Sequence, residues 1–283
     1  LLAGFRKIFY LLLGGSQLRV LMVGDIVGRP GRKVLGYVLP KLIKDKQLDF
    51  VIVNGENSAG GFGITAETFK EIKKAGADVV TSGNHIWDKR DAEDLIDSEP
   101  RLLRPANYPP GVGGRGSIVV DVSGVKVGVI NLAGRVYMEA LDCPFRKAEE
   151  IVQEMHQAGV KLIFVDMHAE ATSEKEAMGF YLDGRVTAVV GTHTHVPTGD
   201  ERVLENGTAY QTDLGMTGPR DGVLGVDKDI IVAKFLEGTP KRFEVAKGAV
   251  WFCGLIVEAD DATGKALGVE RVRIEFEKDN LPW

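Results

Sequence analysis

The sequence predicts an α/β fold in which helices cover two packed β-sheets. Short β-branched apolar runs alternate with helical patterns between residues 18 and 191, as they do where helices join parallel strands. The last third of the chain is again rich in strand patterns, and no change in composition marks a domain boundary. We therefore expect a single domain at residues 18–283, preceded by an N-terminal extension at residues 1–17.

The first part of this domain is predicted to be a β-α-β-α-β unit. Three apolar runs of strand length lie at residues 18–24, 49–54 and 78–83. Pro30 suits the first turn of a helix that runs to about Lys46. Thr65 is a residue type that caps helices, and it precedes the second helical pattern, at residues 66–75.

The pattern changes after a turn-rich stretch at residues 100–116. Residues 117–122 and 125–131 flank Ser123-Gly124 and predict an antiparallel hairpin. The helices and strands expected next lie at residues 144–158, 161–167, 173–182 and 186–191. Near the C-terminus, two further strand patterns flank a turn, at residues 249–259 and 266–276.

Charge and cysteine content limit the kinds of partner. The net charge of −5 gives no basic surface for duplex DNA, whereas a single nucleotide or a short RNA end remains compatible, because bound metals bring positive charge. Cys143 and Cys253 are too few for a disulfide framework, so free thiols and a cytoplasmic location are expected. A homo-oligomer is compatible with this composition.

The N-terminal segment is apolar and carries Arg6 and Lys7. Its uninterrupted apolar run, Ile8–Leu13, is far shorter than the roughly 20 residues that a membrane span needs. It also fits a signal peptide poorly. We interpret it as an upstream extension or an amphipathic segment, without stable membrane insertion; a weak membrane or partner contact is the alternative.

Polar side chains gather where the predicted strands end. There are five such clusters, namely Gly24-Asp25, Asn54–Asn57, Gly83–His85, Asp166–His168 and Gly191–His195. Four of the five histidines of the chain lie in these turns. Loops at the carboxyl ends of parallel strands surround a common crevice, so the clusters are expected to form one site.

The residue types in these clusters fit a site for two metal ions. Imidazole, carboxylate and amide groups together suit divalent iron, manganese or zinc. The candidate ligands are too many for one ion, namely Asp25, Glu56, Asn57, Asn84, His85, His168, His193 and His195. A two-metal site holds its ions roughly 3.5–4 Å apart and supplies a bridging hydroxide that attacks phosphorus in line. The sequence therefore predicts a two-metal phosphoester hydrolase.

Each cluster also has a simpler explanation. Asp25 would equally serve as a helix cap, and Glu56-Asn57 as turn residues. His193 and His195 lie two positions apart, so an extended segment would put both rings on one side for structural reasons. These explanations require a separate coincidence at each strand end, and the joint pattern favours metal ligands. His156 lies in a predicted helix and is interpreted as an ordinary helix residue.

Several longer motifs point to a known family: GDIVGRPGR, NGENSAGGFG, SGNHIWD, HAEATSEKEA, GTHTHVPT and YQTDLGMTG. As a set they resemble the calcineurin-like metallophosphoesterase superfamily, and most closely its bacterial 2′,3′-cyclic-nucleotide 2′-phosphodiesterase branch. The resemblance runs from about Leu18 to the final strands. It implies a four-layer αββα sandwich of two mixed β-sheets flanked by helices.

The resemblance also implies a ligand set in which two ions share Glu56. The other ligands of the first ion would be Asp25, Asn57 and His195. Those of the second would be Asn84, His168 and His193. His85 would stay off the metals and protonate the departing ribose oxygen or stabilise the transition state.

Two departures from the superfamily pattern bear on the metals. Val27 stands where a histidine is common, and Glu56 stands where the bridging residue is usually aspartate. Asn57 can replace the missing histidine, and its harder oxygen favours iron, manganese or magnesium over zinc at the first position. For the site as a whole, iron or manganese is expected, with magnesium or zinc as alternatives.

Other polar residues have less defined roles. The residues expected to orient the ligands are Asp166, Thr192, Thr194 and Asp213. Arg135 would meet a phosphate or base, or else form a surface salt bridge. Thr172 or Ser173 is expected to cap the helix that follows His168, which accounts for part of the pattern around Glu170 and Glu174.

The resemblance implies hydrolysis of 2′,3′-cyclic nucleotides, or of short RNA ends carrying the cyclic phosphate, to 3′-phosphates. A 5′-nucleotidase or broad-specificity phosphodiesterase using the same site is the alternative enzyme. A signalling or RNA-binding regulator that retains the metal site is the alternative of another class.

Overall fold

In the computed structural model, which describes residues 17–283, the first sheet is mixed and has seven strands. They are β1 (Gln17–Val23), β2 (Asp25–Ile26), β3 (Phe50–Asn54), β4 (Val79–Thr81), β11 (Met216–Pro219), β12 (Val250–Asp260) and β13 (Ala266–Phe276). The order is β2-β11-β12-β1-β3-β4, with β13 paired to β12. Strands β1, β3 and β4 are parallel, as their alternation with helices predicts, and β12 runs antiparallel to β1.

The second sheet has six strands, in the order β5-β6-β7-β8-β10-β9. They are β5 (Ser117–Val122), β6 (Val125–Ala133), β7 (Leu162–His168), β8 (Ala188–Thr192), β9 (Arg202–Val203) and β10 (Ala209–Gln211). The β5–β6 hairpin is antiparallel, as predicted, and β6, β7 and β8 are parallel.

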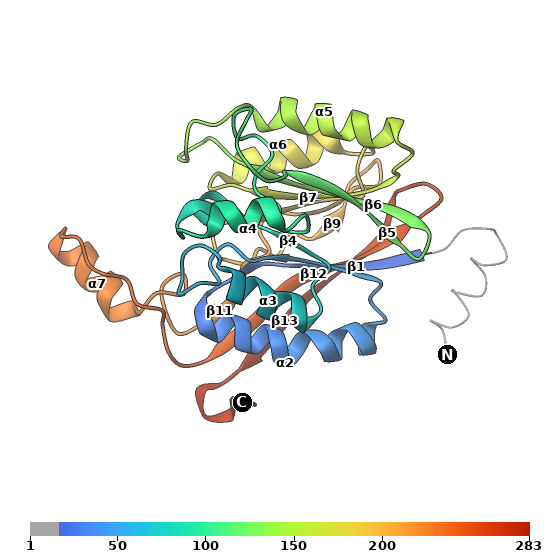
Figure 1. The fold of residues 1–283 in the computed structure, drawn as a ribbon. Coiled ribbons are helices and arrows are strands. Elements are labelled where there is room, and N and C mark those ends of the chain that lie inside the picture. The colour runs from blue at the N-terminus through green and yellow to red at the C-terminus, as the bar shows by residue number, and fades with distance from the viewer. Residues whose placement is uncertain (1–16) are drawn as a thin grey trace.

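The two sheets and the helices form four layers (Figure 1). Helices α2 (Gly28–Lys46) and α3 (Ala66–Ala75) lie on the outer face of the first sheet. Helices α5 (Pro144–Gln157) and α6 (Thr172–Leu182) cover the second sheet on the opposite side of the molecule. This arrangement confirms the αββα sandwich.

Strand β1 explains why the sequence gives these layers. From Val20 to Val23 its side chains alternate between two buried faces, which produces an apolar run rather than an apolar–polar alternation. Leu21 and Val23 pack in the core under α2 and α3. Val20 and Met22 pack in the core between the two sheets.

The starts of the first two long helices differ in how they are capped. Thr65 caps α3 as predicted, in a capping box with Thr68. Helix α2 begins at Gly28, after an N-cap residue, Val27, that makes no side-chain capping bond. Asp25 lies in β2 instead, so the capping explanation for its carboxylate is wrong.

Several short elements were not predicted. They are α4 (Ala92–Ser98), the 3₁₀ turns at Asn84–Trp87 and Lys278–Asn280, strands β2, β9, β10 and β11, and helix α7 (Lys228–Glu237). Helix α7 projects from the body of the molecule on residues 224–245, here called the arm, at the left of Figure 1. The proposed N-terminal extension lies, except for Gln17, outside the described residues. No helix within residues 17–283 combines the length and apolarity needed to cross a membrane.

Candidate metal centre

The predicted ligands meet at one edge of the sandwich because both sheets present the ends of parallel strands there. The first sheet supplies Asp25 in β2 and, from the loop after β3, Glu56 and Asn57. The turn after β4 supplies Asn84 and His85, and the second sheet supplies His168 from β7 and the loop carrying His193 and His195. The site therefore spans the junction of the two sheets.

His168 is at the centre of the cluster and is fully buried. Its Nε2 atom lies 3.1 Å from Glu56 Oε1, 3.1 Å from Asn84 Oδ1 and 3.0 Å from His193 Nδ1. Ligand atoms of Glu56, His168 and His193 all lie within 4.8 Å of one another. One ring nitrogen has at most one proton to share among three such neighbours, whereas a cation between them would accept a lone pair from each.

A second group of ligand atoms adjoins Glu56. The amide nitrogen of Asn57 lies 3.1 Å from Glu56 Oε1 and 3.0 Å from His195 Nε2. Asp25 accepts a hydrogen bond from the backbone N–H of His193 through its Oδ2 atom, at 3.1 Å. Its other oxygen, Oδ1, lies 3.8 Å from His168 Nδ1.

Two buried oxygen atoms of this group show that the residues suit a cation. Asp25 Oδ1 and Asn57 Oδ1 are buried and have no hydrogen-bond partner. A buried oxygen without a partner costs folding free energy, and metal coordination relieves that cost. Both atoms are hard oxygen donors beside imidazole nitrogens, so the donor set fits a divalent cation.

A chain of hydrogen bonds behind His168 sets its tautomer. Thr192 Oγ1 donates its proton to Asp166 Oδ1 at 2.7 Å, so it accepts from His168 Nδ1 at 2.9 Å. Nδ1 therefore keeps its proton, and Nε2 is the nitrogen that faces Glu56 and would ligate a metal. Asp166 also accepts from Thr81 Oγ1 at 2.5 Å and Asn54 Nδ2 at 3.0 Å. The orienting role predicted for Asp166 and Thr192 agrees with these contacts.

The loop after β8 is not extended at His193 and His195. Strand β8 ends at Thr192, and both histidines have left-handed backbone angles, with φ of 98° and 66°. Such angles strain residues that carry a side chain, and they persist where surrounding contacts hold them. Asp213 accepts from both the N–H and the hydroxyl of Thr194, between the two histidines.

His195 is oriented from the other side of the site. Its Nδ1 donates to the carbonyl oxygen of Leu224 at 2.9 Å, because a carbonyl can only accept. The unprotonated Nε2 atom therefore faces Asn57 and is the one free to ligate a metal.

In the metal-free protein Glu56 and His168 form an ionised pair, in which His168 also carries a proton on Nε2 that a bound cation would displace. Burial alone would raise the pKa of Glu56, but His168 outweighs it and lowers that pKa to about 2. Burial alone would lower the pKa of His168, but Glu56 and then Asp25 outweigh it and raise that pKa to about 9. Burial and the charge of His168 lower the pKa of His193 to about 3, which leaves it neutral.

His85 lies beside this cluster and is not part of it. Its backbone N–H donates to Glu56 Oε2 at 3.3 Å, while its ring turns away and places Nδ1 2.8 Å from Asp88 Oδ2. The ring lines a cavity of about 370 Å³ together with Glu56, Asn57, His193 and His195. This position is compatible with the predicted separation of His85 from the metals.

The start of the helix after His168 differs from the prediction. Helix α6 begins after Ala171, which makes no side-chain capping bond, so neither Thr172 nor Ser173 is the cap. Glu174 instead accepts a hydrogen bond from the backbone N–H of Arg135, a residue that is exposed. Glu170, whose role was undefined, lies 3.2 Å from His193 Nε2.

Sequence reasoning missed Asp88 and the far wall of the cavity. That wall is mostly apolar. The arm supplies its residues, namely Leu224, Ile231, Phe235, Phe243 and Val245. A signal for α7 was present, because Asp227 and Gly238 are typical first and last cap residues. Asp227 does accept from the N–H groups of Asp229 and Ile230, and Gly238 is left-handed.

Comparison with known proteins identifies the family. The model of the family described as "YmdB-like protein" matches residues 21–272. The chain is 48% identical over 257 residues to a protein of Bacillus subtilis (strain 168) named 2′,3′-cyclic-nucleotide 2′-phosphodiesterase, covering 91% of this chain and 97% of that one.

Solved structures agree with this result. A structure described as a novel phosphatase from Mycoplasma pneumoniae is 33% identical, with a TM-score of 0.88 over 93% of this chain and 95% of the other. The 5′-nucleotidase precursor of Thermus thermophilus shares the fold alone. It is 16% identical, with a TM-score of 0.59 over 93% of this chain and 55% of its own. The resemblance inferred from the motifs is confirmed: the chain belongs to the YmdB-like protein family.

Proposed function

We propose that this protein is a metal-dependent phosphodiesterase that opens 2′,3′-cyclic nucleotides, free or at short RNA ends, to 3′-phosphates. The observation that carries the proposal is the convergence of Glu56, Asn84, His168 and His193 on one point, beside the unpartnered oxygens of Asp25 and Asn57. The 48% identity to the Bacillus subtilis phosphodiesterase supports the substrate.

Two divalent ions would be held by seven residues, with Glu56 between them. The donors are Asp25, Glu56, Asn57 and His195 for one ion, and Glu56, Asn84, His168 and His193 for the other. Amide and carboxylate oxygens favour iron or manganese, with magnesium and zinc as alternatives. When bound, the ions supply an activated water and neutralise the charge that gathers on the phosphoryl oxygens.

His85 would supply the proton for the leaving group. Water adds to phosphorus and the bond between phosphorus and the 2′-oxygen breaks, so that oxygen needs a proton. Asp88 accepts from Nδ1 of His85, which leaves Nε2 as the nitrogen that can hand a proton to the 2′-oxygen.

A substrate panel tests the proposal. With manganese fixed and saturating, we expect kcat/KM for 2′,3′-cyclic nucleotides to exceed that for p-nitrophenyl phosphate and for 5′-nucleotides. A preference for the phosphate monoesters would favour the 5′-nucleotidase alternative, which the shared fold leaves open. Metal-loaded protein that hydrolyses none of these compounds would favour the regulator.

A further inference from the structure

The cavity beside the metal ligands extends beyond what phosphate chemistry requires. One end is polar and carries Glu56, His193 and His85. The other end is largely apolar and carries Phe62, from the glycine-rich loop after β3, and Phe243, from the arm, with Lys234 beside the Phe243 ring. A phosphoryl group needs charged and hydrogen-bonding neighbours, so the apolar end is suited to another part of a substrate.

Two aromatic rings dominate this apolar end. The rings of Phe62 and Phe243 are close to parallel, with centroids 6.2 Å apart and planes 25° apart. The ring of Phe62 also meets the imidazole of His85 edge to face, at 4.9 Å between centroids. The Nζ atom of Lys234 lies 4.6 Å from the centroid of the Phe243 ring, a cation–π contact that steadies the ring on the arm.

We propose that Phe62 and Phe243 form a subsite that binds the nucleobase of the substrate by stacking. This inference rests on the proposed function, because it assumes a nucleotide at the metal site. In a nucleotide one ribose separates the base from the 2′,3′-phosphate. Since Phe62 touches His85, a base on Phe62 has its cyclic phosphate within one ribose of the proposed proton donor.

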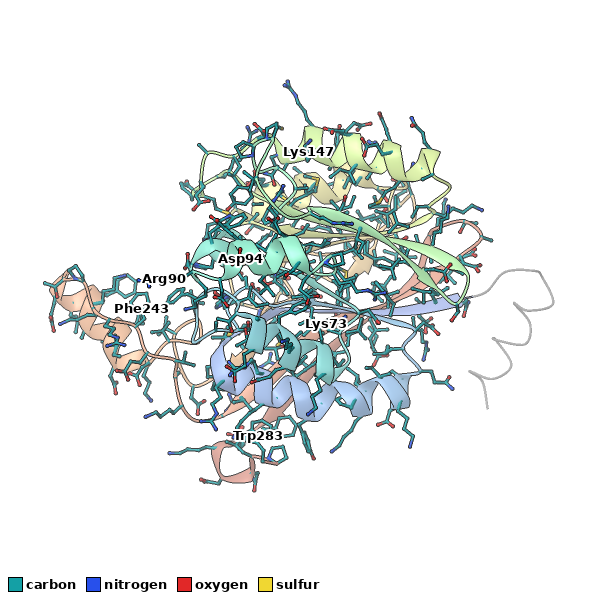
Figure 2. All side chains as sticks on the ribbon, viewed as in Figure 1. Lys73, Arg90, Asp94, Lys147, Phe243 and Trp283 are labelled. Carbon is teal, nitrogen blue, oxygen red and sulfur yellow. The ribbon has the colours of Figure 1, made fainter. Side chains whose placement is uncertain are left out.

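The arm is built to admit a base between the rings. Two stacking separations of about 3.5 Å each add up to about 7 Å, slightly more than the present ring spacing. The arm that carries Phe243 projects from the body (Figures 1 and 2), and Ile231 is the one buried residue of α7. A small outward movement of the arm therefore exposes little core and makes room for the base.

Stacking predicts a particular kind of base preference. Every nucleobase presents an aromatic face, so a stacking subsite tolerates all four bases. Purines overlap the rings over a larger area than pyrimidines. We expect all four 2′,3′-cyclic nucleotides to be hydrolysed, with lower KM for the two purine nucleotides.

The test compares Phe243→Ala with a matched variant, using two substrates. The substrates are 2′,3′-cyclic AMP and the methyl riboside 2′,3′-cyclic phosphate, which lacks a base. Loss of a stacking partner should raise KM for cyclic AMP by about tenfold with kcat nearly unchanged. KM for the base-free substrate should not change, and Phe243→Trp should restore the wild-type KM.

Leu236→Ala is the control, because Leu236 is an apolar residue of the same helix that is 82% exposed and does not line the cavity. We expect it to leave both KM values unchanged. Circular dichroism verifies that both alanine variants are folded.

The outcomes separate this inference from the proposed function. If wild-type enzyme hydrolyses neither substrate, the proposed function fails. If it hydrolyses both with equal KM, or if Phe243→Ala leaves KM for cyclic AMP unchanged, the function stands and the base subsite is wrong. If Phe243→Ala leaves KM for cyclic AMP unchanged but alters the elution volume in size-exclusion chromatography, Phe62 and Phe243 serve self-association instead.

Discussion

At the scale of single residues, the hydrogen bonds behind a ligand decide which of its atoms faces a metal. His168 donates from Nδ1 to Thr192, and Thr192 donates in turn to Asp166. This order leaves Nε2 toward Glu56 and Asn84, as the atom that would ligate a metal. Removing the intermediate hydroxyl would let the ring change tautomer or turn without removing any ligand.

Thr192→Val is therefore expected to weaken manganese binding by about 10- to 100-fold, because valine keeps the shape of threonine and lacks its hydroxyl. Calorimetric titration of metal-free protein measures the change. Thr187→Val is the matched control, since Thr187 is equally buried and its hydroxyl bonds Ile163 and Gly264 instead. Equal losses of manganese affinity in the two variants would show that the Thr192 hydroxyl stabilises the fold in general and does not orient His168.

His85→Ala separates proton transfer from metal binding. Because His85 lies outside the ligand cluster, kcat on cyclic nucleotides should fall by about 10²- to 10⁴-fold while both metals are retained. Metal analysis and steady-state kinetics on the same preparation give both quantities. His156→Ala, on the exposed side of α5, should change neither. Loss of a metal ion from His85→Ala would contradict the assigned role.

The cluster of candidate ligands could be predicted from the sequence because residue type and position both carry information. Carboxylates, amides and histidines stand at strand ends, and strand ends converge in a parallel sheet. The contact of Asp88 with His85 could not be predicted, since it depends on which way the imidazole turns. The strained backbone of His193 and His195 was missed for a similar reason, because it depends on contacts with Asp25 and Leu224.

At the scale of elements, the turn between β4 and the 3₁₀ helix leaves no room for a side chain. A Cβ atom on Gly83 would lie 2.2 Å from Glu56 Oε2 and 2.2 Å from His168 Nε2. The two ligands can approach each other only because this residue is glycine.

Gly83→Ala should therefore lower the bound metal below two ions per chain, because the new methyl group displaces Glu56 or His168. Elemental analysis after metal loading measures the ratio. Gly36→Ala is the contrasting variant, since Gly36 is exposed in α2 and a Cβ there meets nothing within 4 Å. It should retain both metals and raise the free energy of unfolding by about 0.5–1 kcal/mol. Full metal content in Gly83→Ala would refute the steric explanation.

Elements with one buried stripe or two buried faces were predicted well, as β1 and α3 illustrate. Helix α7 was missed because its apolar residues do not form a buried stripe: Phe235 and Leu236 are both 82% exposed. Strands β2 and β9 have two residues each, which is too short for an alternating pattern to appear. The pairing of β12 with β1 joins distant parts of the chain and has no local signal.

At the scale of the whole molecule, the site and the packing of the two sheets depend on each other. Asp166 of the second sheet accepts from Asn54 and Thr81 of the first. Ser82, after β4, donates its backbone N–H to Asn131 of β6 at 3.0 Å. A metal bound by residues of both sheets therefore adds a further connection between them.

Chelation of the metals should lower the melting temperature, because a ligand that binds only the folded state stabilises it. At a metal concentration of 100 Kd this amounts to about 2.7 kcal/mol, or roughly 5–10 °C for a chain of this size. Differential scanning calorimetry with and without EDTA measures the shift. An unchanged melting temperature would mean that the ligands hold no metal in the folded protein.

The central claim is that two ions share Glu56, and anomalous diffraction from metal-loaded crystals tests it directly. Data collected on both sides of the absorption edge of the loaded metal locate each ion. We expect two peaks, one on each side of the Glu56 carboxylate. The first should lie beside Asp25, Asn57 and His195, and the second beside Asn84, His168 and His193. A single peak, or no peak within reach of Glu56, would contradict it.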